Sequence, residues 1–181
     1  MLELGCGTGN DAARLARAGL DVTATDYSLE AITRAKERFT DCGIDFEVVD
    51  MTKELPFGDE QYDAVMSNVA AYMFSDEVTR RLLAEVKRVL RHGGLLLLHV
   101  NSDADRELRA VRRPVKLELE PNYVLEESGQ TVRFFSGDYL RSVLADWSIQ
   151  EMAHVEILDS ATGRPFKRVW RVVATSEFRY S

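Results

Sequence analysis

Three glycines at alternate positions lie near the start of the chain, Gly5, Gly7 and Gly9 in "MLELGCGTGN". Glycine adopts positive φ angles and lets backbone amides approach a ligand that a Cβ would keep away. A glycine-rich turn between a strand and a helix therefore predicts a binding site for a nucleotide-like ligand.

Two aspartates stand where later strands are expected to end, Asp26 after "LDVTAT" and Asp50 after "FEVV". Ligands of open parallel sheets lie beyond the carboxyl ends of the strands, so both carboxylates should meet the glycine turn. Asp26 is placed to accept both hydroxyls of a ribose. Asp50 and the backbone N–H of Met51 are placed to contact the edge of an adenine. The three strand ends together predict an adenosine-shaped site.

The spacing of the glycines separates the candidate ligands. A dinucleotide site has the pattern G-x-G-x-x-G and room for a pyrophosphate at the helix N-terminus. This chain has G-x-G-x-G, and Asp11 occupies the first turn of the helix, where a pyrophosphate would sit. A phosphate-binding P-loop is excluded because no Gly-Lys-Ser/Thr follows the turn.

The elements that must position these residues alternate between strand and helix over the first hundred residues. Strands are expected at 1–4, 20–26, 44–50, 62–68 and 95–101. Helices are expected at 11–18, from the cap Ser28 to 39, and from the cap Ser75 to 90, where Gly93 and Gly94 should stop the last one. This alternation predicts an α/β fold with a parallel sheet and helices on both faces.

The pattern changes after residue 102. Residues 103–116 are polar and basic, and 115–135 alternate like a pair of strands. A helix at 136–147 and two strands at 148–159 and 164–176 follow, the last two joined by a Gly- and Pro-containing turn. We expect one domain over 1–181, with an insertion at about 103–135 that contributes to the acceptor site and a hairpin that closes the sheet.

Composition sets outer bounds on function. The chain has 181 residues, 45% of them apolar, and a net charge of −7, which disfavours general binding to nucleic acid. No apolar run approaches the length of a membrane helix, and the first residues do not read as a signal peptide. Cys6 and Cys42 are too few for a disulfide framework, and no cluster has metal-ligand spacing. We expect no metal, no membrane association and a cytoplasmic location.

Five segments resemble, in order, the motifs of class I S-adenosylmethionine-dependent methyltransferases. They are "LELGCGTGN", "VTATDYS", "FEVVDM", "LPFGDEQYDAVMSN" and "EVKRVLRHGGLLLL", and they run from residue 1 to about residue 100. The tail, "VRFFSGDYLRSVLADWSI" and "PFKRVWRVVA", is more loosely similar to small bacterial members grouped with tellurite-resistance and thiopurine methyltransferases. The resemblance implies a Rossmann-like seven-stranded sheet whose last strand is antiparallel.

The resemblance also implies roles for single residues. Glu3, Gly5 and Gly7 would border the methionine moiety of S-adenosylmethionine, and Asp26 would hold the ribose. Tyr27, Asp50 and Met51 would surround the adenine, and Asn68 would line the cleft near the methyl group. The expected cofactor site comprises Glu3, Gly5, Cys6, Gly7, Gly9, Asp26, Tyr27, Asp50, Met51 and Asn68.

The acceptor side of the site is less defined. Tyr72, Tyr123 and Phe135 are expected to wall a pocket for a small molecule, facing the positive cofactor through cation–π contacts. Phe74 and Phe134 are further candidates, although Phe134 and Phe135 read equally well as core. His99 and Tyr72 are the candidate general bases, but His99 is interpreted as a core histidine and no catalytic base is assigned. The basic residues from Arg106 to Lys116 are interpreted as a solvated helix face.

The leading hypothesis is transfer of a methyl group from S-adenosylmethionine to a small-molecule acceptor by in-line displacement. The alternative is a protein that binds S-adenosylmethionine or S-adenosylhomocysteine without transfer, either a degenerate paralogue or a partner subunit. This alternative rests on the expectation that the chain lacks the segment that commonly precedes the first strand in this family. A homodimer is one possible assembly. A nicotinamide-dependent reductase fits the glycine spacing poorly.

Overall fold

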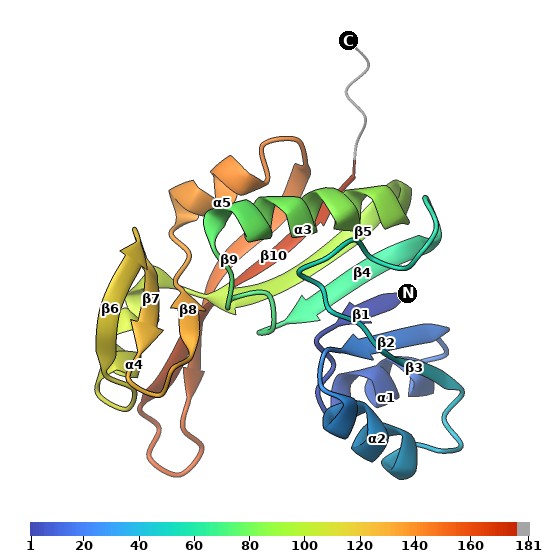
Figure 1. Ribbon diagram of the computed structural model, residues 1–181, viewed down its shortest axis with the longest axis horizontal. Coiled ribbons are helices and arrows are strands. Elements are labelled where there is room, and N and C mark those ends of the chain that lie inside the picture. Colours follow the sequence, from blue (N-terminus) through green and yellow to red (C-terminus); the bar gives the residue numbers. More distant parts are fainter. Residues whose placement is uncertain (177–181) are drawn as a thin grey trace.

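A mostly parallel sheet organises the molecule (Figure 1), which a computed structural model describes for residues 1–176. Within this part of the chain the sheet has seven strands in the order β3-β2-β1-β4-β5-β10-β9. Their bounds are β1 Leu2–Leu4, β2 Val22–Asp26, β3 Ile44–Val48, β4 Tyr62–Asn68, β5 Leu90–Asn101, β9 Ser148–Leu158 and β10 Pro165–Thr175. Strands β1 to β5 are parallel, and β10 runs antiparallel to both of its neighbours. The predicted fold class and the antiparallel hairpin are confirmed.

Four helices lie on the two faces of this sheet in the described residues. Helices α1 (Asn10–Arg17) and α2 (Leu29–Arg38) lie beside β1–β3, whereas α3 (Asp76–Val89) and α5 (Gly137–Val143) cover the other face over β4, β5 and β10 (Figure 1). The predicted caps are confirmed: the Ser28 hydroxyl accepts the Ala31 N–H, and the Ser75 hydroxyl accepts the Val78 N–H. Each bond satisfies an otherwise unpaired amide in the first turn of its helix.

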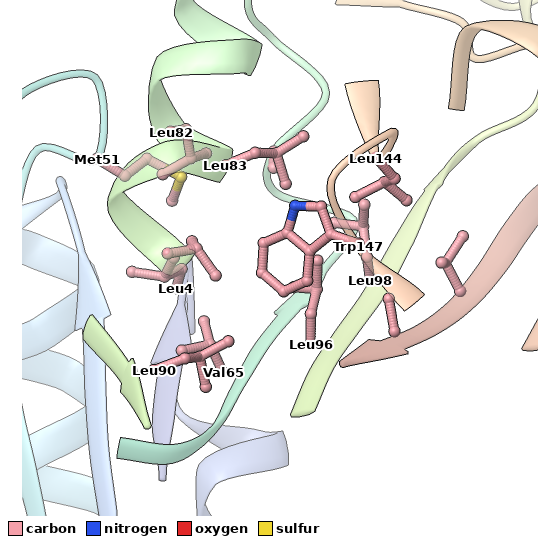
Figure 2. Close-up of a cluster of buried hydrophobic side chains, with 14 of the residues drawn as sticks. Leu4, Met51, Val65, Leu82, Leu83, Leu90, Leu96, Leu98, Leu144 and Trp147 are labelled. Carbon is pink, nitrogen blue, oxygen red and sulfur yellow. The ribbon is translucent and has the colours of Figure 1, made fainter. Parts of the chain in front are cut away.

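The main core lies between the sheet and helices α3 and α5 (Figure 2). Leucines that alternate along β5, Leu96 and Leu98, face the apolar stripe of α3, where Leu82 and Leu83 are buried. Trp147, which follows α5 in the chain, lies among these side chains (Figure 2) and is 8% exposed. Burial of such side chains contributes roughly 1.5–3 kcal/mol each, so this face of the sheet is the rigid part of the scaffold.

The predicted role of Gly93 and Gly94 as the stop signal between α3 and β5 is wrong. The helix stops at Val89 and β5 begins at Leu90 without a loop, so Gly93 and Gly94 lie inside the strand. The pairing of β5 with β4 slips between Leu90 and Leu95, which marks a bulge around the two glycines. A Cβ on Gly94 would lie 2.9 Å from the carbonyl oxygen of Arg91, so this bulge has space only for glycine.

The region between β5 and α5 differs from the predicted strand pair. A 3₁₀ turn, η1 (Asp103–Asp105), and a short helix, α4 (Arg106–Ala110), lead into a separate sheet of three strands, at the left in Figure 1. The strands are β6 Val115–Glu120, β7 Tyr123–Glu126 and β8 Thr131–Arg133. The chain reverses twice, at Asn122 with φ 59° and at Gly129 with φ 84°, so this region forms three strands and not two.

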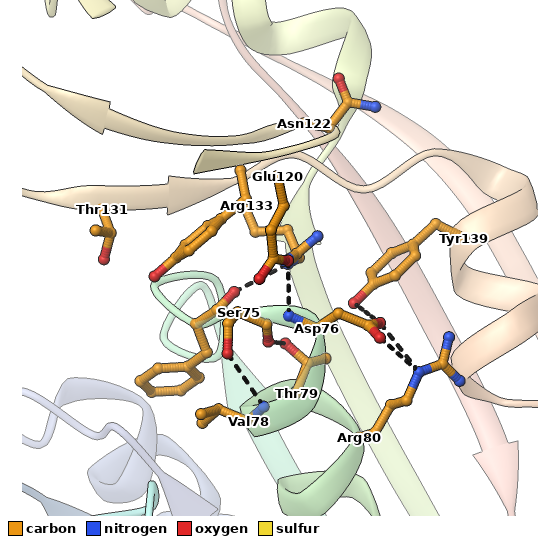
Figure 3. A network of polar contacts seen from close by, with 12 residues as sticks. Ser75, Asp76, Val78, Thr79, Arg80, Glu120, Asn122, Thr131, Arg133 and Tyr139 are labelled. Carbon is orange, nitrogen blue, oxygen red and sulfur yellow. Dashed lines mark hydrogen bonds and ion pairs between the residues drawn. The ribbon is translucent and has the colours of Figure 1, made fainter. Parts of the chain in front are cut away.

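A polar network joins this three-stranded sheet to the start of α3 (Figure 3). Glu120 forms an ion pair with Arg133 and accepts the Asp76 N–H at 3.0 Å. Arg133 also donates to the carbonyl oxygen of Phe74 at 2.9 Å, and the Tyr139 hydroxyl donates to Asp76 at 2.8 Å. The network fixes residues 69–74, the loop between β4 and α3, against the three-stranded sheet.

Candidate functional site

The three glycines of the turn after β1 have positive φ angles but different surroundings. A Cβ on Gly5 would lie 2.1 Å from the Cβ of Ala70, and one on Gly9 would lie 2.8 Å from the ring of Phe46. A Cβ on Gly7 would meet nothing within 4 Å, at a φ of 54°. Packing therefore requires glycine at two positions, while Gly7 presents bare backbone to open space.

Asp26, at the end of β2, is held in one orientation by two backbone amides. The Gly7 N–H donates to its Oδ2 and the Ser28 N–H donates to its Oδ1, each at 2.9 Å. Each carboxylate oxygen keeps a further lone pair for another donor. The arrangement suits a ligand that presents two adjacent hydroxyl groups.

A cavity of about 440 Å³ lies beside this carboxylate. Its lining residues are Gly5, Asp26, Tyr27, Asp50, Met51, Thr52, Ala70, Met73 and Phe74. The structure thus brings together five of the ten predicted cofactor-site residues: Gly5, Asp26, Tyr27, Asp50 and Met51. Thr52 and Met73 were missed by the sequence reasoning, since neither residue type signals binding by itself.

Asp50 and Tyr27 occupy the outer part of this cavity. The Asp50 carboxylate accepts the Thr52 N–H at 3.0 Å and the Thr52 hydroxyl at 2.7 Å, and these bonds lower its pKa. Tyr27 is 70% exposed, so one face of its ring remains available for stacking. Met51 is 8% exposed and closes the inner end.

The loop that covers Gly5 begins with strained backbone. Val69 has a φ of 53°, in the left-handed region that β-branched residues rarely adopt. Its N–H donates to the carbonyl oxygen of His99 at 2.9 Å, which fixes the turn. This turn places Ala70 on Gly5, and nothing in the sequence around Val69 indicated it.

Glu3 and Cys6 lie beneath the glycine turn rather than in the cavity. Glu3 is 2% exposed, and its Oε2 has no hydrogen-bond partner among the described residues. Burial, with a smaller contribution from the nearby Asp11 carboxylate, raises the pKa of Glu3 from 4.5 to about 7. Burial also raises the pKa of the Cys6 thiol to about 12, so Cys6 is a protonated core residue and not a nucleophile.

Asn68, at the end of β4, lies on the other side of the sheet from α3. Its amide donates to Asp11 at 2.7 Å, and its oxygen faces Nδ1 of His99 at 3.1 Å. His99 therefore carries its proton on Nδ1 and keeps the Nε2 lone pair. The three side chains border a second cavity of about 330 Å³, lined by both apolar and polar residues of α1, β4, β5 and β10. The interpretation of His99 as a core histidine is wrong, because its ring is only half-buried and polar on one side.

The predicted acceptor residues are not brought into one pocket. Phe135 is 1% exposed and packs in the main core against Tyr139, so its prediction as a pocket wall is wrong. The Tyr123 hydroxyl donates to the carbonyl oxygen of Met73 at 3.2 Å, which supports the loop. The ring of Tyr72 lies 5.9 Å from the Arg109 guanidinium carbon and 5.8 Å from the Lys167 nitrogen.

The interpretation of the basic residues as a solvated helix face is wrong for Arg106 and Arg109, which are half-buried, whereas Arg113 and Lys116 are exposed as expected. Arg106 pairs with Glu118, and Arg109 forms two bonds to Glu126, a carboxylate that is 1% exposed. Arg112 donates to the carbonyl oxygen of Phe166 at 2.7 Å. These side chains turn toward the protein because α4 is only five residues long and lies against β10 and the three-stranded sheet.

The charges around the 440 Å³ cavity restrict its ligand. Asp26 and Asp50 line it, the buried Glu3 lies below the turn, and no described lysine or arginine belongs to its lining. A pyrophosphate would meet these carboxylates unfavourably, whereas a nucleoside that carries a positive charge would be attracted. The bare backbone of Gly7, the unpartnered oxygen of Glu3 and the oriented Asp26 carboxylate all fit such a ligand.

Residues 1–176 contain neither a membrane-spanning helix nor a metal-binding cluster. No helix in this range is long and apolar enough to cross a membrane. No group of three or more histidines, cysteines or acidic residues in the same range is arranged to hold a metal ion.

Comparisons with known proteins match this chain to methyltransferases. The family model described as "Methyltransferase domain" matches residues 1–94. The ubiquinone/menaquinone biosynthesis C-methyltransferase of Desulfotalea psychrophila is 40% identical over 96 residues, which are 52% of this chain and 38% of that protein. The chain thus covers less than two thirds of the length of that relative.

Solved structures share the fold over nearly the whole chain. An S-adenosylmethionine-dependent methyltransferase from Methanosarcina mazei superposes with a TM-score of 0.81 at 23% identity, covering 98% of this chain and 92% of that one. A didemethyltoxoflavin N1-methyltransferase of Burkholderia thailandensis, solved with S-adenosylhomocysteine, has a TM-score of 0.72 at 19% identity, covering 98% and 70%. The second match includes the three-stranded sheet region that the family model leaves unmatched.

Proposed function

The chain belongs to the methyltransferase-domain family, and from this premise we propose that it is a class I methyltransferase that uses S-adenosylmethionine to methylate a small-molecule acceptor. The observation that carries the proposal is the Asp26 carboxylate, held by the Gly7 and Ser28 amides at the rim of a cavity that no described lysine or arginine lines. That geometry fits a ribose in a nucleoside with a positive charge.

The chain offers a group for each part of the cofactor. Asp26 would accept the two ribose hydroxyls, and Tyr27, Asp50 and Met51 would surround the adenine. Gly7 would lie against the methionine moiety, whose ammonium group would be attracted toward Glu3. When bound, S-adenosylmethionine supplies an electrophilic methyl carbon: an acceptor lone pair forms the new bond to it, the carbon–sulfur bond breaks with its electron pair left on sulfur, and any acceptor proton passes to water.

The protein's part in this chemistry is positioning and exclusion of water, because the leaving group is already good. Residues 69–74 form the wall between the 440 Å³ cavity, called the adenosine cavity below, and the three-stranded sheet. Arg133 donates a hydrogen bond to the Phe74 carbonyl oxygen, and the Tyr123 and Thr131 hydroxyls donate to the Met73 carbonyl oxygen. A base is required only if the acceptor is a hydroxyl or an amine. No catalytic base is assigned, because His99 borders the 330 Å³ cavity and does not line the adenosine cavity.

Calorimetry tests the proposal directly. S-adenosylmethionine and S-adenosylhomocysteine should bind the protein, and NADH should not. Asp26→Asn replaces one accepting oxygen with an amide donor, so affinity for S-adenosylhomocysteine should fall by more than tenfold. Asp45→Asn, a matched change at an exposed position of β3, should leave that affinity unchanged. Preference for NADH, or equal affinity in the Asp26 variant, would contradict the proposal.

An acceptor screen separates transfer from binding alone. Tight binding of both adenosyl ligands without methylated product over a broad set of acceptors would favour the alternative of a binding protein. Within the proposal, a place among the tellurite-resistance and thiopurine methyltransferases and a cytoplasmic location remain predictions from the sequence.

A further inference from the structure

A third cavity, of about 600 Å³, lies between α4 and β10, and one of its lining residues, Lys167, is close to the Tyr72 ring of the loop 69–74. Four of its lining side chains are cationic: Arg109 from α4, Arg112 and Arg113 from the turn after it, and Lys167 from β10. One lining side chain, Asp105, is anionic. The lining thus carries a net charge of +3 in a chain whose net charge is −7.

The cations in this cavity are incompletely neutralised. Arg109 is paired with Glu126, but Arg112, Arg113 and Lys167 form no ion pair with any described residue. Asp105 is 1% exposed and uses one carboxylate oxygen to accept the Arg168 N–H at 2.7 Å. Gathering like charges costs free energy unless a bound anion offsets their repulsion.

Lys167 shows this cost most clearly. Burial is the main reason that its pKa lies below the ordinary value; the Asp105 carboxylate opposes this shift, and repulsion from Arg109 and Arg112 adds to it. Its ammonium group lies 5.8 Å from the centre of the Tyr72 ring, a cation–π contact that offers weaker compensation than a carboxylate would. The side chain is therefore poised for an anionic partner.

The position of Tyr72 relates the two cavities. Its ring faces Arg109 and Lys167, whereas its loop neighbours Ala70, Met73 and Phe74 line the adenosine cavity. A molecule with an anionic group among these cations and its remainder beside Tyr72 would lie next to the loop that lines the adenosine cavity. Guanidinium forks match carboxylates and phosphates through paired hydrogen bonds, which suits either group.

We propose that the methyl acceptor is a small organic anion whose carboxylate or phosphate group binds among Arg112, Arg113 and Lys167. This inference rests on the proposed methyl transfer, since it names the class of acceptor for that reaction. Neutral and cationic acceptors are disfavoured, because either would leave Asp105 as the one described carboxylate in the lining to offset these three cations.

The test uses simple anions as probes of the whole protein. NMR titrations with phenyl phosphate and with benzoate distinguish the two anionic groups, and benzamide is the uncharged match. The double variant Lys167→Met/Arg113→Gln removes two charges while keeping the apolar stem beside Tyr72. Arg17→Gln, at the exposed end of α1, removes one charge far from the cavity.

We expect one of the two anions to bind the native protein, to bind the double variant at least tenfold more weakly, and to bind Arg17→Gln unchanged. Failure of both anions to bind, or equal affinity in the double variant, would overturn the inference. S-adenosylhomocysteine should bind all three proteins equally, so this second titration reports on the proposed function alone. If it binds and the anions do not, only the acceptor class is wrong.

Discussion

Replacing Glu3 by glutamine should stabilise the ligand-free protein at high pH. The carboxyl is 2% exposed, has an unpartnered oxygen, and has a pKa raised from 4.5 to about 7. Because the folded state holds this proton more tightly than the unfolded state, stability is greatest at low pH and falls as pH rises from 4.5 through 7. A shift of this size corresponds to about 3 kcal/mol lost once Glu3 is ionised.

Glutamine keeps the shape of the side chain and removes the charge. At pH 8 Glu3→Gln should unfold roughly 6–12 °C above the native protein, since each kcal/mol shifts Tm by about 2–4 °C at this chain length. At pH 5 the two proteins should unfold within about 1 kcal/mol of each other. Tryptophan fluorescence can follow both measurements, because Trp147 is buried in the main core. Thermal unfolding gives the change in Tm, and urea unfolding gives the change in the free energy of unfolding.

Glu126→Gln is the matched control for this prediction. Glu126 is equally buried, but it forms an ion pair with Arg109. Replacing its carboxylate with an amide leaves Arg109 without that partner, so Glu126→Gln should be less stable than the native protein at both pH 5 and pH 8. The reasoning fails if Glu3→Gln is no more stable than the native protein at pH 8, or if its advantage is the same at pH 5.

Two changes in the glycine turn should separate packing from ligand binding. Gly9→Ala forces a Cβ against the Phe46 ring at a φ of 78°, so urea unfolding should show a loss of roughly 2–4 kcal/mol. Gly7→Ala meets no neighbour and should cost only about 1 kcal/mol for its positive φ, yet should weaken S-adenosylhomocysteine binding at least tenfold. Equal losses of stability in the two variants, or unchanged affinity in Gly7→Ala, would contradict this division.

Local patterns predicted most of the first hundred residues correctly. Strand β4 spans the predicted 62–68, and Ser28 and Ser75 cap their helices as expected, because these signals depend on neighbours in sequence. The carboxyl ends of β1, β2 and β3 meet because parallel strands share an edge, which is why Asp26 and Asp50 could be placed together.

The remaining features depend on contacts between distant segments. Phe135 was assigned to a pocket because aromatic residues serve core and binding sites alike, and only the packing of α5 shows that it is core. Lys167 lies 54 positions after Arg113 along the chain, so their cavity had no sequence signal. Val69 is an unexpected residue for a left-handed turn, and no propensity would have placed one there.

The place of β10 in the sheet has a consequence for synthesis. This strand follows every other described element, yet it lies between β5 and β9 and pairs with both. Until residues 165–175 are made, the leucine-rich β5 has an open edge, and open edges invite pairing with other chains. Because a domain generally folds as a unit, this sheet cannot be completed until β10 has been synthesised. The interval before β10 docks is therefore when the nascent protein is most exposed to aggregation.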